Sequence, residues 1–487
     1  MKINKLRLKN YRCFESLEID FHDNLTVIVG TNGAGKTTLL DALCVALSPY
    51  LSKFDEGKRI PIASSDARRV KVDDDGYQME PQYPVQIEAL GFWEQIESQA
   101  SGSEDNNIKH ALGGFFEQVK HMRFTQAINS YLDQSWKNQY HYWRCTSNSA
   151  KSSGRLSEAL ILTNYGHDMQ SEARKNKEIN LPLLAYFGAH RQDKNFSPSL
   201  NKKHILSDSR TIGYRECLNP SSNYQDFIQW FRELNYAYTQ ITLRQVEEPT
   251  LNHVQRLQDT LKVMTNTVKH CLKNTGWINF YFDLAEDQIM VGNERNEVLP
   301  VTFLSDGLRS VIALAADIAF RCCKLNGHLG QNAVVDTSGI VMIDELDLHL
   351  HPAWQQTIVP AFQKAFPKLQ FILTTHSPHL LSTVSSECIR VLKDGKIIQP
   401  TIETQGEQSR VVLEEIFGVS TWPPMSIVED LWHYQDLVSK GKYDFQEAIQ
   451  LRQKLDAHYG KNHEELMASD FIIMRLEALK ESQQKKK

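Results

Sequence analysis

The chain begins with alternating polar and apolar residues, followed by a fully apolar run. Ile3, Leu6 and Leu8 are interleaved with lysine and arginine, a pattern that predicts a strand with one buried face. Residues 25–29, LTVIV, form a short β-branched run that predicts a buried central strand. A loop with glycines follows, and residues 37–47 have apolar positions at helical spacing. The pattern therefore predicts a strand, a turn, a second strand, a loop and a helix.

Later apolar runs predict further strands, at residues 181–187, 278–282, 288–291, 340–345 and 370–375. Between them, residues 210–275 have mostly helical periodicity, and a helix is predicted to begin near Pro352. Residues 424–480 predict three short amphipathic helices. The chain is thus predicted to mix buried strands with helices and to end in a helical tail.

Composition and charge narrow the class of protein. The chain is 41% hydrophobic and 23% charged, which is ordinary for a soluble globular protein. It lacks any apolar run of about 18 residues, and its basic start has no secretory signal, so we expect a cytoplasmic protein without a membrane span. Eight cysteines without a CxxC pair favour reduced thiols. The net charge of −5 means that nucleic acid could be contacted only through a local patch.

The loop after the first buried strand has the form of a phosphate-binding loop. Residues 30–37, GTNGAGKT, fit GxxxxGK[ST] at every fixed position and lie between a predicted strand and a predicted helix. Backbone N–H groups in such a loop surround the β-phosphate, and the helix N-terminus adds a favourable dipole. We expect Lys36 to neutralise the β- and γ-phosphates and the Thr37 hydroxyl to hold Mg²⁺. The predicted nucleotide-binding residues here are Asn32, Gly33, Gly35, Lys36, Thr37 and Thr38.

Two acids, Asp344 and Glu345, end the predicted strand at 340–345. Carboxylates at the end of a buried strand are costly unless something pairs with them. We expect Asp344 to order Mg²⁺ and Glu345 to act as the base that polarises the attacking water. His376 follows the strand at 370–375, where it would lie beside Glu345 and contact the γ-phosphate.

A further motif, LSDGL at residues 304–308, precedes a helix predicted to begin near Val311. Ser305 and the Gly307 backbone at a helix N-terminus could bind an anion. The same residues could equally form a simple helix cap.

Taken together, these motifs resemble the set found in ABC-type ATPases: the phosphate-binding loop, LSDGL for LSGGQ, the Asp-Glu pair, the D-loop at 346–352 and a switch histidine. KNYRCF at 9–14, after a basic strand, resembles the RecF/SMC-like branch. The resemblance covers residues 1–400. It implies an α/β fold: an ABC-ATPase head, which is a P-loop NTPase with a mixed central sheet and flanking helices, with a helical lobe and a C-terminal helical tail.

The resemblance also implies roles. Two heads would sandwich two ATP molecules, so that Ser305 and Gly307 of one subunit face the γ-phosphate held by the other. Asp347 of the D-loop would contact nucleotide, and Gln192 would be a Q-loop ligand of Mg²⁺. Asp306 replaces a signature glycine, which leaves the rate of hydrolysis open.

We expect four parts: ATPase lobe I with insertions at 1–209, a helical lobe with return strands at 210–300, ATPase lobe II at 301–400, and a helical partner-docking region at 401–487. The last part is too short to bury much core alone, so it either caps the ATPase body or docks a partner. Its aromatic side chains are of the types that dominate interfaces, namely Trp432, Tyr434, Phe445 and Tyr459.

The segment EEIFGVS at 414–420, followed by such helices, resembles the PtuA ATPases of Septu-type antiphage systems, which also occur with some retrons. This implies a homodimer or higher homo-oligomer that binds ATP and Mg²⁺ and gates a separate HNH nuclease acting on DNA. In a retron the partners would include a reverse transcriptase and its msDNA. Two alternatives stay open: a RecF-like DNA-repair clamp without a nuclease, and a transporter ATPase subunit.

Overall fold

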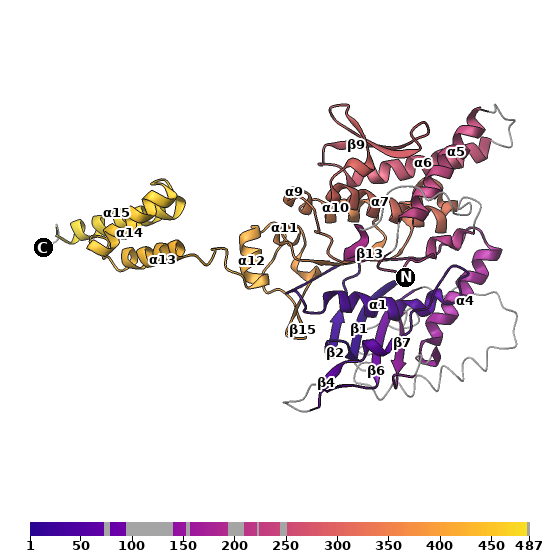
Figure 1. Cartoon of the computed structure of the whole chain (residues 1–487), viewed down its shortest axis with the longest axis horizontal. Coiled ribbons are helices and arrows are strands. Elements are labelled where there is room, and N and C mark those ends of the chain that lie inside the picture. Colours follow the sequence, from indigo (N-terminus) through magenta and orange to yellow (C-terminus); the bar gives the residue numbers. More distant parts are fainter. Residues whose placement is uncertain are drawn as a thin grey trace. The chain divides into compact units, whose positions relative to one another are not determined.

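The computed structural model describes residues 1–72, 78–93, 140–151, 156–192, 209–221, 224–243 and 251–484 (Figure 1). The chain forms two compact units, Met1–Val412 and Leu413–Lys487. The finer division of the first unit at residues 209 and 300 stays a prediction. Within the described ranges, every helix is too short or too polar to span a membrane.

A six-stranded sheet with the order β15-β14-β3-β13-β12-β8 lies at the centre of the first unit. Its strands are β3 (Leu25–Gly30), β8 (Leu183–Phe187), β12 (Gly339–Ile343), β13 (Leu369–Thr375), β14 (Ile389–Lys393) and β15 (Lys396–Ile398). Only β15 runs antiparallel to its neighbour. Every residue of β3, β8, β12 and β13 is buried. The predicted buried strands and the α/β class with a mixed sheet are therefore confirmed.

The register of this sheet brings distant segments to one edge. Ile343 at the end of β12 pairs with Phe187 of β8 on one side and with Leu373 of β13 on the other. Thr375 of β13 pairs with Val29 of β3. Because parallel strands end at the same edge, the loops that follow β3, β8, β12 and β13 meet there, which is where open α/β sheets bind ligands.

A second, antiparallel sheet with the order β2-β1-β6-β7 contains the N-terminus. Its strands are β1 (Lys2–Tyr11), β2 (Phe14–Asp20), β6 (Val85–Phe92) and β7 (Tyr140–Ser147). The predicted alternation is confirmed, since Ile3, Leu6 and Leu8 are fully buried. On the other face, Lys5 and Arg7 form ion pairs with Glu18 at 2.8 and 2.6 Å. Acids of neighbouring strands thus offset the positive charge of β1.

The chain between residues 36 and 417 also forms helices (Figure 1). They are α1 (Lys36–Leu51), α4 (Leu160–Lys175), α5 (Gln225–Leu243), α6 (Leu251–Cys271), α7 (Asp306–Leu325), α8 (Ala333–Asp336), α9 (Pro352–Gln355), α10 (Ile358–Ala365), α11 (Pro378–Leu381) and α12 (Ser409–Phe417).

Helix α7 begins at Asp306 rather than near Val311 as predicted. Ser305 takes the N-cap position, and an acid in the first turn is favourable there. LSDGL therefore forms the start of α7.

Two small sheets and several 3-10 turns complete the first unit. The sheets are β11-β10-β9, made of β9 (Trp277–Asp283), β10 (Gln288–Asn293) and β11 (Val298–Pro300), and the pair β4 (Arg69–Lys71) and β5 (Met79–Pro81). The 3-10 turns are η1 (Ser64–Asp66), η2 (Leu156–Ala159), η3 (Ala189–Gln192), η4 (Arg210–Tyr214), η6 (Val301–Phe303), η7 (Gly327–Asn332) and η8 (Ser386–Cys388).

The second unit contains the three predicted tail helices, α13 (Ser426–Ser439), α14 (Gln446–Tyr459) and α15 (Glu464–Gln484). These helices bury a core of their own, made of Leu431, Tyr434, Leu437, Val438, Ala448, Leu455 and Leu466. The tail was expected to bury little core by itself, and this core is small: four of its residues come from α13, two from α14 and one from α15. Tyr434 belongs to this core and is not an exposed anchor, and Tyr459 is partly buried against it. Trp432 and Phe445 are exposed.

Candidate functional site

The phosphate-binding loop connects β3 to α1, as predicted. Gly33 and Gly35 have φ angles of 79° and 107°, in the left-handed region that glycine adopts without strain. A Cβ at Gly35 would lie 2.5 Å from Cζ of Phe14 and 2.8 Å from Sγ of Cys13. The loop thus requires glycine at 35 for both conformation and space. Asn32 and Gly33 are exposed, and the Thr38 hydroxyl donates to the Cys13 sulfur.

Lys36, the first residue of α1, folds back over this loop. Its Nζ donates to the carbonyl oxygens of Gly30 at 3.0 Å and Thr31 at 3.2 Å. Burial lowers the pKa of Lys36, whereas the charges of Asp344, Glu345 and Asp347 act to raise it. Both acceptors are neutral, so a phosphate could replace them with stronger charge-assisted hydrogen bonds.

Thr37 and Asp344 meet although they are far apart in sequence. The Thr37 hydroxyl donates to Oδ2 of Asp344 at 2.7 Å, and Thr374 donates to Oδ1 at 2.5 Å. Asp344 is 2% exposed. A hydroxyl and a buried carboxylate are the hard oxygen donors that Mg²⁺ prefers beside phosphate. The donor set therefore fits Mg²⁺, which Thr37 and Asp344 would hold.

Glu345 has an unusual backbone and an unengaged side chain. Its φ is 49°, a left-handed conformation that is strained for a non-glycine residue. Its N–H donates to Oγ1 of Thr374 at 2.8 Å, and its carbonyl accepts from Arg191 at 3.0 Å. Within the described ranges, no side chain holds the Glu345 carboxylate by a hydrogen bond or an ion pair.

Asp347 and His376 lie on neighbouring loops of the same edge. Asp347 accepts from Oγ1 of Thr375 at 2.6 Å and from the N–H of His376 at 3.4 Å. Burial and the Lys36 charge lower the pKa of His376, against the opposing effect of the nearby acids. His376 is therefore close enough to Lys36 to feel its charge. The structure brings the phosphate-binding loop, Asp344, Glu345, Asp347 and His376 together.

The signature residues at the start of α7 are placed differently. Ser305 and Asp306 are exposed, and Asp306 pairs with Arg309. Gly307 is buried, and a Cβ there would collide with the carbonyl oxygen of His349 in the D-loop. Ser305 is thus at the surface, available to a second molecule. The Gln192 backbone ends η3, but its side chain lies outside the described part, so its role as a metal ligand stays a prediction.

Sequence reasoning missed two residues that hold this site together. Arg191 is 1% exposed and bonds the backbone after β12. Thr374 uses one hydroxyl for both Asp344 and Glu345. Arg191 follows the buried strand β8, and Thr374 lies near the end of the buried strand β13. A polar side chain at such a position needs a partner, which is how the sequence could have indicated both residues.

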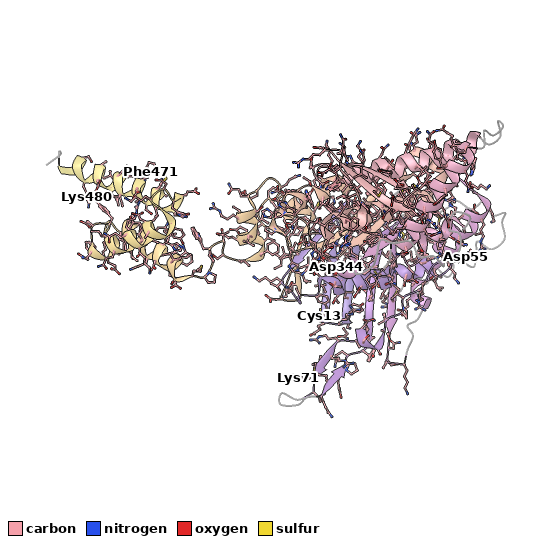
Figure 2. The ribbon with its side chains drawn as sticks, turned by 45° about the horizontal axis from the view of Figure 1, so that its top comes forward. Cys13, Asp55, Lys71, Asp344, Phe471 and Lys480 are labelled. Carbon is pink, nitrogen blue, oxygen red and sulfur yellow. The ribbon has the colours of Figure 1, made fainter. Side chains whose placement is uncertain are left out.

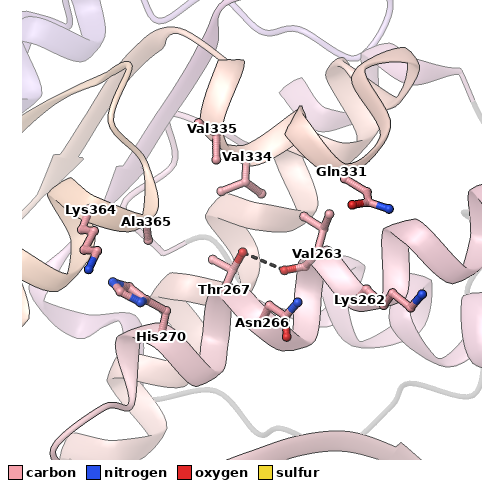
Figure 3. A pocket seen from close by; sticks show the side chains of 10 residues that line it. All are labelled: Lys262, Val263, Asn266, Thr267, His270, Gln331, Val334, Val335, Lys364 and Ala365. Carbon is pink, nitrogen blue, oxygen red and sulfur yellow. Dashed lines mark hydrogen bonds between the residues drawn. The ribbon is translucent and has the colours of Figure 1, made fainter.

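A cavity of about 330 Å³ lies between α6, η7–α8 and α10 (Figure 3). Its lining includes Lys262, His270, Gln331 and Lys364, and burial together with the Lys364 charge lowers the pKa of His270. None of the predicted site residues lines it.

The chain is similar to several known proteins. Residues 1–381 match the family described as AAA ATPase domain. The probable ATPase of retron Ec83 from Escherichia coli is 26% identical over 519 residues, covering 96% of this chain and 85% of the relative. A Septu protein PtuA from Bacillus thuringiensis is 23% identical over 442 residues, covering 87% of this chain and 86% of the relative. A solved SMC head bound to the C-winged helix domain of ScpA aligns over 81% of this chain and 97% of its own, with a TM-score of 0.43 and 15% identity. Because the family match spans most of the sequence, the chain belongs to the AAA ATPase domain family.

Proposed function

We propose that the chain is the ATPase of a bacterial antiphage defence system, which binds ATP and Mg²⁺, dimerises around ATP and controls a separate HNH-type nuclease that acts on DNA. The observation that carries the ATPase part is the meeting of Thr37 with Asp344 at 2.7 Å, beside a Glu345 carboxylate that no described side chain engages. The names of the relatives, a retron ATPase and a Septu PtuA, support the defence setting.

In this proposal each site residue has one task. Loop N–H groups and Lys36 hold the phosphates, with Asn32, Gly33, Gly35 and Thr38 shaping the loop. Thr37 and Asp344, joined by Gln192, hold Mg²⁺, which neutralises charge on the phosphates when bound. Glu345 takes a proton from the attacking water, and His376 donates a hydrogen bond to the γ-phosphate. Asp347 fixes the loop of His376 through its contact with the His376 N–H.

Two substitutions separate binding from hydrolysis. Lys36→Ala removes the main countercharge of the triphosphate, so ATP binding should be lost. Glu345→Gln keeps the shape and the phosphate contacts, but a carboxamide cannot accept the proton, so binding should persist while hydrolysis slows. Fluorescent-nucleotide titration and phosphate release measure the two effects. Hydrolysis by Glu345→Gln at the parental rate would rule out Glu345 as the base.

The dimer and the nuclease belong to the same proposal. The exposed Ser305 would face nucleotide bound by a second copy of the chain, with Gly307 behind it. The tail would dock the nuclease through apolar side chains that its own core leaves outside, among them Phe471 and Met474 of α15, which are 67% and 63% exposed (Figure 2). In a retron, the complex would also contain the reverse transcriptase and its msDNA.

A further inference from the structure

We propose that Arg191 is a positioning residue that fixes the backbone of Glu345 and couples it to helix α7. This inference rests on the proposed role of Glu345 as the base. It concerns how that base is held and how the surface-exposed start of α7 is connected to it.

The Arg191 guanidinium reaches four acceptors in three segments. Its Nη1 donates to the carbonyl oxygens of Asp344 at 2.6 Å and Gly188 at 3.2 Å. Its Nη2 donates to the carbonyl oxygen of Glu345 at 3.0 Å, and its Nε donates to Oγ of Ser310 at 3.2 Å. The planar guanidinium group has N–H donors on several sides and can reach all four acceptors at once. The single ammonium group of a lysine could not.

The bonds to Asp344 and Glu345 act on a strained backbone. A non-glycine residue at a φ of 49° is strained and persists only when its surroundings determine it. The Glu345 carbonyl accepts from the Leu348 N–H at 3.1 Å within its own loop. The side-chain bonds to the Glu345 backbone come from Thr374, which holds its N–H, and from Arg191, which holds its carbonyl. These two bonds lie on either side of the Glu345 Cα. They therefore fix the direction in which the carboxylate leaves the backbone.

The bond to Ser310 extends this support to α7. Ser310 is buried in α7, close after the exposed Ser305. A second contact joins the same parts, because Gly307 packs directly on the carbonyl of His349. Helix α7 is thus attached to the segment after β12 at two points. A shift of α7 when Ser305 engages a ligand would be transmitted through Arg191 to Glu345.

The side chain of Arg191 is charged although it is buried. All four of its acceptors are neutral, so among the described residues no ion pair consumes its charge. The acids nearest to it, Asp344, Asp347 and Glu345, are attracted to the guanidinium, although burial lowers the Arg191 pKa. A purely packing role would not need this charge, since an apolar side chain fills a buried site at less cost.

The first test compares two buried arginines. Arg191→Met should lower kcat about 10- to 100-fold, the usual effect of losing a residue that orients a catalytic group, with little change in ATP affinity or KM. Arg191→Lys should restore only part of the rate. Arg390→Met is the matched control, because Arg390 is 5% exposed and donates to the carbonyls of Asp20, Glu387 and Ile389. We expect Arg390→Met to lower the melting temperature without lowering kcat.

The second test is a double-mutant cycle with Glu345→Gln. If Arg191 acts through Glu345, Arg191→Met should slow the parent but not the residual rate of Glu345→Gln. Ser310→Ala removes only the link to α7, and it should lower kcat less than Arg191→Met does and add nothing to it. If Arg191→Met does not fold, Ser310→Ala still tests whether the bond between Arg191 and α7 affects kcat.

Three outcomes would overturn the inference: a parental kcat for Arg191→Met, an equal loss of rate in the Glu345→Gln background, or additive effects of Ser310→Ala and Arg191→Met. Each of these leaves the proposed ATPase intact as long as Glu345→Gln itself slows hydrolysis. An active Glu345→Gln would instead refute the proposed base.

Discussion

Glycine at positions 33 and 35 serves two different purposes, although both residues have a positive φ. Around Gly33 nothing lies within 4 Å of an added Cβ, whereas at Gly35 the Cβ would collide with Phe14 and Cys13. Phe14 is itself buried and has little room to move. The same residue type is thus required by backbone conformation alone at one position, and by packing as well at the other.

We therefore predict that Gly35→Ala is far more damaging than Gly33→Ala. Gly33→Ala should lower stability by about 1 kcal/mol, the penalty of a left-handed alanine. Gly35→Ala adds the clash with Phe14, so it should lower the melting temperature further and abolish ATP binding. Thermal melts with and without MgATP measure both. Equal melting temperatures for the two variants would contradict the packing argument.

Thr374 offers a second test at the scale of one residue. Its hydroxyl donates to Asp344 and accepts from the Glu345 N–H. Thr374→Val keeps the shape but leaves two buried polar groups without partners, which costs about 1–3 kcal/mol each. We expect a lower melting temperature and slower hydrolysis, with Thr374→Ser restoring both. A Thr374→Ser variant as impaired as Thr374→Val would show that the methyl group matters, not the hydroxyl.

At the scale of elements, four parallel strands create the site. Their ends coincide because β8, β12, β13 and β3 pair in register. Local patterns were sufficient to predict these strands and α1, because a fully buried strand is apolar along its length. The start of α7 was predicted too late, since Ser305 and Asp306 are polar and exposed and a glycine follows them. Gly307 then marks where α7 contacts the D-loop.

If the exposed start of α7 completes the site of a second copy, two inactive variants should restore activity together. Each ATP site would be formed by Lys36 of one copy and Ser305 of the other. Ser305→Arg inactivates the Ser305 contribution to both sites, and Lys36→Ala inactivates the Lys36 contribution. A mixed dimer contains one site with an intact Lys36 and an intact Ser305, so mixing should recover part of the ATPase activity. Absence of recovery, in mixtures where heterodimers are detected by tag pull-down, would argue against the sandwich.

At the scale of the whole molecule, the chain is two units with separate cores. Helix α12 crosses the boundary near residue 412, and α13 to α15 enclose their own apolar cluster. The exposed Trp432, Phe445 and Phe471 remain outside that cluster, as expected for a unit that binds another molecule.

We predict that truncation after Val419 leaves a stable ATPase. The cut keeps α12 whole and removes a unit whose core lies within itself, so the melting temperature and ATP binding should be close to those of the full chain. The truncated chain should no longer pull down the proposed HNH-type nuclease. A large drop in melting temperature would mean that the tail caps the ATPase body. A stable truncated chain that still retains the nuclease would place the docking surface elsewhere.

The sequence by itself determined what depends on neighbours along the chain: the phosphate-binding loop, the buried strands, α1 and the three tail helices. Each is encoded within a short segment by glycines, apolar runs or helical spacing. Only the tertiary structure decided what depends on distant partners. The motifs assigned Thr37 and Asp344 to the same metal, but only the fold shows that these residues, 307 positions apart, meet directly. Arg191 and Glu345 are 154 positions apart, and no local pattern connected them. The burial of Tyr434 was likewise decided by packing, because an aromatic side chain suits a core and an interface equally well.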